Sequence, residues 1–147
     1  ALKIKNVDRE YLEKAIETMK TKYNTLREMA EKGAFYFKKE IDFVESDVRK
    51  YLVPEVLPAI LELFSEMKKM NELDAQKLED LFRRVAARYG LKLIMLAQPI
   101  RVALSGRSVS PGLFEMMSVL GKDETFRRIE NAIAMIKERA AKEHHGS

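Results

Sequence analysis

The sequence predicts an all-α protein, a compact bundle or cage of about seven helices in two small packed lobes. Three observations favour this class. No segment alternates apolar and polar residues over the length of a strand, and no internal repeat is present. Apolar residues instead recur at the three- and four-residue spacing of a helix. The 147 residues suffice for one domain, or for two lobes that share a core.

The composition limits the classes of function. Hydrophobic residues make up 46% and charged residues 34% of the chain, which excludes wholesale disorder. The absence of cysteine excludes thiol catalysis, cysteine-based metal sites and disulfides. No apolar run reaches the ~20 residues that span a bilayer, and the N-terminus lacks a signal-peptide pattern. We therefore expect a cytoplasmic protein that makes no contact with membranes, and we further expect it to be a monomer.

Residues 1–70 are predicted to form an N-terminal lobe that continues from a region upstream. Asp8 can cap a first helix that ends near Lys22. A threonine and a glutamate three positions later form a capping box, which predicts a second helix over residues 25–38. The first helix has an apolar face made of Tyr11, Leu12, Ala15, Ile16 and Met19.

The aromatic segment 35–47 is compatible with a short extended piece. A short helical turn should then begin at Ser46 and end before Pro54, because the residue before a proline avoids helical geometry. The chain from Pro54 to Met70 reads as one helix, with Pro58 near its start. Its inward residues are predicted to be Ile60, Leu63, Phe64 and Met67.

Residues 71–142 are predicted to form the second lobe. Asp74 should cap an amphipathic helix that Gly90 ends. The apolar segment from Lys92 to Leu104 should be the central buried helix. The stripe of the amphipathic helix consists of Leu78, Leu81, Phe82, Val85, Ala86 and Tyr89.

Two more helices complete the second lobe. Ser110 is predicted to cap a helix with Pro111 in its first position, and Gly121 should end that helix. Asp123 should cap the last helix, and residues 143–147 are expected to form a tail outside the fold. The last helix has an apolar face made of Phe126, Ile129, Ile133, Ile136 and Ala140.

The sequence lacks the residue combinations that common catalytic sites use. The only two histidines, His144 and His145, lie in the tail, so a nucleophile in this chain has no histidine base. The glycines are dispersed and form no phosphate-binding loop. Carboxylates such as Glu28 and Glu62 lie on charged helix faces. We therefore expect no catalytic centre, metal site or cofactor site in this chain.

One long stretch carries a single sign of charge. Leu81–Phe114 contains six basic residues and no acidic residue in 34 positions. If these side chains share a face, they form the positive surface typical of a nucleic-acid backbone site. Arg84, Arg88 and Lys92 are the candidate phosphate contacts, although a merely solvated basic face would show the same pattern.

The second half of this stretch offers a more specific pattern. On a helical wheel, Gln98, Arg101 and Ser105 form one polar edge of an otherwise apolar helix, and the edge points toward the loop 105–112. Pro99 should kink the helix. The alternative reading of Arg101 is a helix-end cation that pairs with a carboxylate.

The loop itself favours a binding site for bases. A free helix N-terminus at Ser110-Pro111-Gly112-Leu113 would place backbone amides beside Arg101 and Arg107. Gly112 would let a planar group approach the backbone, and small apolar faces lie on either side of it. Donors next to small apolar surfaces suit unstacked bases of single-stranded RNA.

These residues resemble a known family, the C-terminal anticodon-binding region of bacterial-type glutamyl-tRNA synthetases, which are class I aminoacyl-tRNA synthetases. The resemblance is specific from Gly90 to Ile129 and looser upstream, around Thr25-Leu26-Arg27-Glu28 and Phe35-Tyr36-Phe37. It rests mainly on Gly90-Leu91-Lys92-Leu93, Gln98-Pro99-Ile100-Arg101, Ser110-Pro111-Gly112-Leu113-Phe114-Glu115 and Arg127-Arg128-Ile129.

The resemblance implies an all-α cage that grips the anticodon loop of glutamate tRNA. It implies that glutamate activation with ATP and Mg²⁺ belongs to a separate Rossmann-type domain, whose two signatures this chain lacks. Arg101, Ser110, Pro111 and Leu113 match family positions that touch anticodon bases. Lys22 is the nearest candidate for discrimination of the third base, where many members have Arg. This departure leaves open whether glutamate and glutamine tRNAs are separated.

The sequence therefore predicts an RNA-binding domain, not an enzyme by itself, with tRNA and not DNA as its partner. The alternative is a helical protein-interaction or scaffold domain whose basic run is a solvated rim. The predicted base-binding residues are Gln98, Arg101, Arg107, Ser110, Pro111, Gly112 and Leu113.

Overall fold

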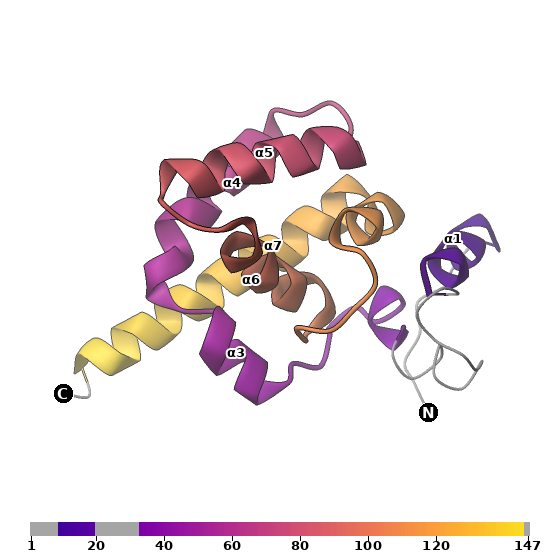
Figure 1. Ribbon diagram of the computed structural model, residues 1–147. Helices are drawn as coiled ribbons and strands as arrows, with labels where there is room; N and C mark the ends of the chain where they lie inside the picture. Colours follow the sequence, from indigo (N-terminus) through magenta and orange to yellow (C-terminus); the bar gives the residue numbers. More distant parts are fainter. Residues whose placement is uncertain (1–8, 20–32, 146–147) are drawn as a thin grey trace.

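The computed structural model describes residues 9–19 and 33–145, and this part of the chain is helical with no strand. Figure 1 shows its arrangement. The all-α prediction is therefore confirmed for this part of the chain. A break at Gly121 also divides the last helix into two segments. The elements are α1 (Arg9–Met19), the 3₁₀ helix η1 (Ala34–Tyr36), α3 (Glu45–Tyr51), the 3₁₀ helix η2 (Pro54–Val56), α4 (Leu57–Lys68), α5 (Ala75–Arg88), α6 (Leu93–Ser105) and α7 (Leu113–His145).

Helix α6 lies at the centre of the fold. It contacts α3, α4, α5, α7 and η1, and Figure 1 shows α3, α4, α5 and α7 arranged around it, with α1 to one side. Its second half is buried, as predicted, except at the half-buried Arg101, and the helix continues through the buried Pro99. Its first half differs, because Ile94 and Met95 are 61% and 48% exposed. The central helix therefore presents an apolar surface to solvent at its N-terminal end.

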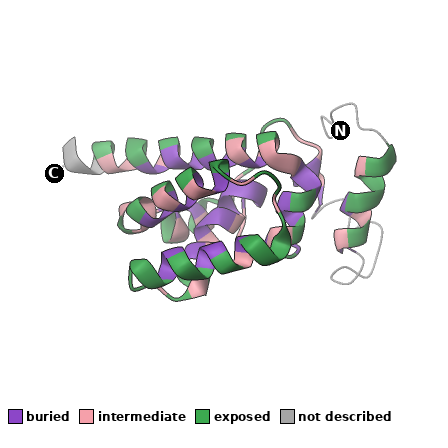
Figure 2. Cartoon of the chain, turned by 90° about the horizontal axis from the view of Figure 1, so that it is seen from above, coloured by how far each residue is buried: buried purple, intermediate pink, exposed green. Residues whose placement is uncertain are grey.

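One hydrophobic core joins residues from both predicted lobes. In Figure 2 the buried residues lie on the inward sides of the helices, and the exposed residues face outward. Helix α4 packs against α5 and α7, and α1 packs against α7. The division between residues 70 and 71 therefore crosses a continuous core, and it stays a prediction.

Helix α5 follows its sequence signals closely. The Asp74 carboxylate accepts hydrogen bonds from the backbone N–H groups of Gln76 and Lys77, at 2.8 and 3.1 Å. Gly90 adopts φ 67°, and the next N–H, of Leu91, donates to the Ala86 carbonyl at 2.8 Å. The predicted stripe is buried from Leu78 to Ala86. Its last member, Tyr89, lies beyond the helix end and is 41% exposed.

Between residues 45 and 68 the predicted helices are present, but their ends differ from the predicted ones. Helix α3 begins at Glu45, one residue before the predicted start, and ends before Pro54. The predicted single helix from Pro54 is instead a turn of 3₁₀ helix followed by α4. Pro58 lies in the first turn of α4. The predicted inward residues are all buried, namely Ile60, Leu63, Phe64 and Met67.

The N-terminal predictions are only partly covered by the structure. Helix α1 is present, but Leu12 is 42% exposed and does not belong to its buried face. Asp8, Lys22 and the capping box of residues 25–28 lie outside the described residues. The predicted end of the second helix at Lys38 is wrong, because residues 34–36 form η1. The aromatic side chains there turn inward, with Phe35 and Tyr36 only 5% and 2% exposed.

Helix α7 corrects two predictions at its ends. It begins at Leu113, where the Met116 N–H donates to the Gly112 carbonyl at 2.9 Å. Ser110 and Pro111 therefore do not start the helix. The predicted stop at Gly121 is confirmed by its φ of 81° and ψ of 171°. The last segment runs on to His145, so the backbone of the expected tail continues the helix as far as that residue.

Two arginines of α7 fix distant segments to one another. Arg128 is 2% exposed, and its guanidinium donates to the carbonyls of Leu104 and Phe35 at 2.6 and 2.7 Å. Its Nε donates to Glu124 at 2.9 Å. Arg139 donates to the carbonyls of Val48 and Leu52, at the end of α3. Segments far apart in the sequence are thus tied to α6 and α7.

Within the described residues, no helix is both long and apolar enough to cross a membrane. The same residues contain no group of histidine and acidic side chains that could hold a metal ion.

Candidate nucleic-acid interface

A cleft of about 460 Å³ opens beside the first half of α6. Its walls are α6, the loop that follows it and the start of α7, and α1 contributes Thr18 from far along the sequence. The cleft is lined by Thr18, Ile94, Ala97, Gln98, Arg101, Ser108, Val109, Ser110, Pro111, Gly112 and Glu115.

Arg101 is the best-anchored polar side chain in this cleft. Its Nε donates to Gln98 Oε1 at 3.1 Å. Its Nη1 donates to Ser110 Oγ at 2.9 Å and to the Pro111 carbonyl at 2.8 Å. Three of the five N–H donors of the guanidinium are thereby committed. The two on Nη2 have no partner in the described part of the chain and are left for a ligand.

The surroundings of Arg101 strengthen the electrostatic interaction that its charge can make with a ligand. Burial lowers the pKa of the guanidinium, and the nearby charge of Glu115 raises it in opposition. An arginine keeps its proton at any physiological pH, so the group stays cationic. A charge in a half-buried cleft interacts more strongly with a ligand than the same charge in water, because the local dielectric constant is lower. The cleft therefore favours a ligand with acceptor atoms.

The loop between α6 and α7 is held in place by α6 itself. Gly106 ends α6 in the left-handed region, at φ 85°, and its N–H donates to the Val102 carbonyl. Ser105 Oγ lies 2.8 and 2.9 Å from the carbonyl oxygens of Arg101 and Arg107, and it can donate its single proton to either of them. The predicted polar edge of α6 therefore does meet the loop.

Helix α3 and the residue before it hold the same loop from the other side. The Val44 N–H donates to the Gly106 carbonyl at 2.8 Å, and the Asp47 carboxylate accepts from the Ser108 N–H at 2.9 Å. A Cβ at Gly106 would lie 2.1 Å from the Asp42 carbonyl oxygen, so only glycine fits. The loop is thus shaped before any ligand binds.

The structure brings most of the predicted base-binding residues together. Gln98, Arg101, Ser110, Pro111 and Gly112 all line the cleft. The other two predicted residues do not. Leu113 is 4% exposed and belongs to the hydrophobic core, and the half-buried Arg107 lies outside the lining. The predicted discriminating residue, Lys22, is outside the described residues.

Several lining residues were not predicted. Ile94 and Val109 are 61% and 62% exposed, so they give the cleft an apolar rim. The sequence did not indicate Thr18 or Glu115 as lining residues. Thr18 belongs to a different helix, α1, and Glu115 has the sequence context of an ordinary surface acid. The position of Glu115, three residues after Gly112, was the signal available, since a helix start places such a side chain over the preceding loop.

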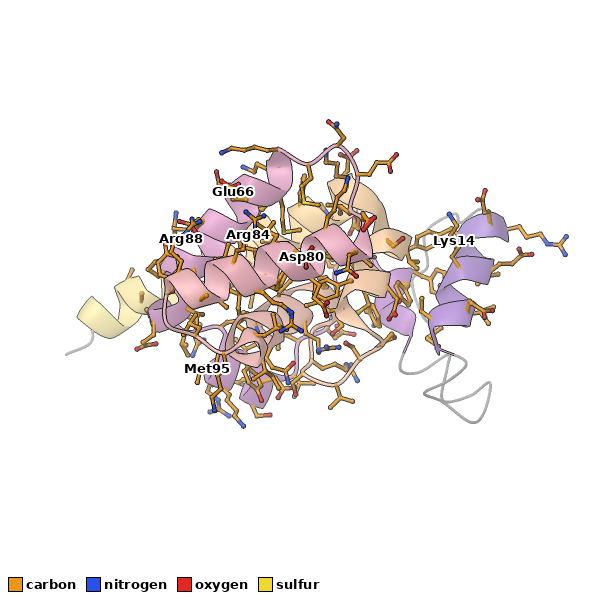
Figure 3. All side chains as sticks on the ribbon, turned by 45° about the horizontal axis from the view of Figure 1, so that its top comes forward. Lys14, Glu66, Asp80, Arg84, Arg88 and Met95 are labelled. Carbon is orange, nitrogen blue, oxygen red and sulfur yellow. The ribbon has the colours of Figure 1, made fainter. Side chains whose placement is uncertain are left out.

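The basic side chains of α5 lie among carboxylates. Arg88 Nη1 pairs with Glu62 of α4, and Arg84 shares a groove with Glu66 and Asp80. Figure 3 shows Arg84, Arg88, Glu66 and Asp80 on the α4–α5 side of the molecule. The stretch without acids in the sequence is therefore not free of acids in space. Lys92, the third predicted phosphate contact, is exposed at the start of α6, two residues from Ile94 on the cleft rim.

These features define a helical binding domain with a preformed cleft that contains hydrogen-bond donors. Such a cleft suits the recognition of small polar groups on a larger partner. The family model for the anticodon binding domain matches residues 1–133. The chain therefore belongs to the anticodon binding domain family.

Relatives and solved structures agree with this assignment. The chain is 40% identical over 131 residues to a glutamate–tRNA ligase of Syntrophobacter fumaroxidans and 40% identical over 124 residues to one of Thermus thermophilus. These alignments cover 89% and 84% of the chain. The crystal structure of a glutamate tRNA ligase from Elizabethkingia meningosepticum superposes with a TM-score of 0.78 at 26% identity, over 89% of this chain and 26% of that one.

The chain spans only 28% and 26% of the length of the two curated relatives. The match therefore concerns one region of those ligases.

Proposed function

We propose that this chain binds the anticodon loop of a glutamate tRNA and serves as one domain of a glutamate–tRNA ligase. In this proposal ATP, Mg²⁺ and the aminoacylation reaction belong to another domain of the ligase. The protein acts as a monomer in the cytoplasm and binds tRNA rather than DNA. Support comes from the family match and from relatives that are glutamate–tRNA ligases.

The anchored guanidinium of Arg101 carries the proposal. Three hydrogen bonds to Gln98, Ser110 and Pro111 set its plane before a ligand arrives. Reading a base edge requires donors in fixed directions, because hydrogen bonds weaken when they are misaligned. Each correct contact is worth about 1–3 kcal/mol of discrimination between bases. Pyrimidines offer O2 together with N3 or O4 as acceptors. The two Nη2 donors suit such an edge.

The size and rim of the cleft support a base as the ligand. A volume of about 460 Å³ is enough for a flat heterocycle. Ile94 and Val109 provide exposed apolar surface at the rim, against which the face of an unstacked base can pack. Aliphatic side chains thus replace the aromatic platforms that the cleft lacks among its described lining residues.

The phosphates are proposed to pass closest to Lys92. Its charge lies next to the cleft, and the described residues give it no ion pair. Arg84 and Arg88 stay candidates, but their acidic neighbours reduce the net positive charge that a phosphate would meet there. Lys22 stays the candidate for reading the third anticodon base, and with it the choice between glutamate and glutamine tRNAs.

A titration of the 147-residue chain with anticodon stem-loops tests the proposal. We expect tighter binding of the glutamate stem-loop than of a stem-loop with the same stem and an unrelated loop. We expect the affinity to fall as salt is added, because bound phosphates release counterions. Equal affinity for the two stem-loops, or no binding at low salt, would remove the RNA-binding function and favour a protein-interaction domain.

A further inference from the structure

The loop wall of the cleft is held on both sides of Val109. On one side, the Ser108 N–H donates to Asp47 Oδ2 at 2.9 Å. On the other side, Ser110 Oγ lies 2.9 Å from Nη1 of Arg101. Val109 lines the cleft and is 62% exposed, although its side chain is apolar. Contacts from two different helices therefore hold the backbone next to an apolar side chain that faces solvent.

Asp47 reaches this loop from a distant part of the chain. It lies in the first turn of α3, 61 positions before Ser108. Helix α3 packs against α6, and Arg139 fixes its end by donating to the carbonyls of Val48 and Leu52 at 3.0 and 2.6 Å. Among the described residues, the Asp47 carboxylate forms no ion pair, and its one hydrogen bond is the contact with Ser108. The carboxylate therefore acts on the loop.

We propose that Asp47 is a positioning residue of the cleft, which sets the place of Val109 against an RNA base through the hydrogen bond from the Ser108 N–H. Asp47 is not among the lining residues, so its effect on a ligand passes through the loop. This inference rests on the proposed anticodon-binding function. It adds a residue of α3 to the parts of the fold on which binding depends.

A loop that is held before the ligand arrives favours binding, because less conformational freedom is lost when the base packs against it. The charge of Asp47 has the opposite effect, because an anion near the site repels the phosphates of RNA. Removal of the charge alone should therefore raise the affinity, and removal of the hydrogen-bond acceptor should lower it. The two roles of the carboxylate can be separated because they differ in sign.

The test compares Asp47→Ala with Asp47→Asn in titrations with the glutamate anticodon stem-loop. Alanine removes the acceptor, so we expect the affinity to fall about tenfold. Asparagine loses the charge but keeps an oxygen that accepts from the Ser108 N–H, so D47N should bind as tightly as the wild type or more tightly. Glu45→Ala is the matched control, because Glu45 is an exposed acid of the same helical turn, and its affinity should not fall.

A double variant tests whether the effect passes through Val109. Val109→Ala removes the apolar side chain that Asp47 is proposed to position. In that background, Asp47→Ala should cost little further affinity, because residues that act through one contact are not additive. An equal fold-loss from D47A with and without Val109 would contradict the inference.

Wild-type affinity in folded Asp47→Ala overturns the inference, as does an equal loss of affinity in Asp47→Asn. Urea unfolding establishes that each variant is folded. If D47A does not fold, Asp47→Glu decides instead, since it keeps the charge in the first turn of α3 but displaces the acceptor. D47E should bind more weakly than the wild type, and wild-type affinity there overturns the inference. Failure of the wild type to prefer the glutamate stem-loop over one with an unrelated loop removes the proposed function itself.

Discussion

Nη1 of Arg101 lies 2.9 Å from Oγ of Ser110, and this contact joins the central helix to the loop that precedes α7. Ser110 is 3% exposed, and its hydroxyl also donates to the Pro111 carbonyl at 3.0 Å. The hydroxyl thus fixes the guanidinium at one end and the loop at the other.

Ser110→Ala should loosen Arg101 without unfolding the domain. The variant removes one of three anchors, and a hydrogen bond to a charged group is worth about 1.5–3 kcal/mol. We expect the affinity for the glutamate stem-loop to fall about tenfold, measured by fluorescence anisotropy. Ser118→Ala, on the exposed side of α7, should bind like the wild type. Wild-type affinity in S110A would mean that Arg101 does not need the Ser110 hydroxyl to bind the stem-loop.

The loop geometry can be tested at Gly106. An alanine there would need a left-handed φ of 85° and would place its Cβ 2.1 Å from the Asp42 carbonyl oxygen. We expect Gly106→Ala to lower the free energy of unfolding by more than about 2 kcal/mol, and to weaken RNA binding. Gly90→Ala has the same backbone strain and open space around it, so it should cost only about 1 kcal/mol. Equal losses in urea unfolding would contradict the steric argument.

Acid should destabilise the fold through Glu124. Burial of this carboxyl acts to raise its pKa, but hydrogen bonds and charges from Arg127 and Arg128 prevail and lower it from 4.5 to about 2. A lowered pKa contributes stability above about pH 4.5, and that contribution is lost as the pH falls toward about 2.

Glu124→Gln should therefore be less stable than the wild type near neutral pH, and its stability should depend less on pH across this interval. Urea unfolding of both proteins at several acidic pH values measures this dependence. Glu130→Gln is the control, with the wild-type dependence expected. A Glu124→Gln curve that parallels the wild type would show that the ion pairs of Glu124 with Arg127 and Arg128 do not govern acid stability.

The basic residues should differ in their effect on the salt dependence of binding. Lys92→Ala removes an unpaired charge beside the cleft, so the slope of log affinity against log salt should decrease by about one. Arg88→Ala removes a cation already paired with Glu62, and the slope should stay unchanged. The reverse order of the two slopes would place the RNA backbone along α5 instead.

Local signals in the sequence were sufficient for much of the fold. Asp74 marks the start of α5 and Gly90 its end, as predicted, and Gly121 interrupts α7. These signals could be read from the sequence because each residue acts on the backbone of the adjacent helical turn. Gln98, Arg101 and Ser105 were placed on one edge because helix geometry alone decides which residues share a face.

The features that the sequence did not reveal depend on residues far apart in the sequence. Ser110 has the sequence signal of a helix cap, but Arg101 and the Pro111 carbonyl engage its hydroxyl, and the helix starts at Leu113. The charge of Arg88 meets Glu62 of another helix. Glu115 lines the same cleft as a loop that Val44 and Asp47 hold from another part of the chain. No pattern within a single helix contains that information.

The most direct test of the account is the affinity of Arg101→Ala for the glutamate anticodon stem-loop. Loss of the guanidinium removes a fixed, charged pair of donors, so we expect binding to weaken about 10- to 100-fold and the base preference to relax. Arg101→Lys keeps the charge but not the planar fork, and should recover little of the preference. Circular dichroism confirms that each variant is folded. Wild-type affinity and base preference in folded Arg101→Ala would contradict the account.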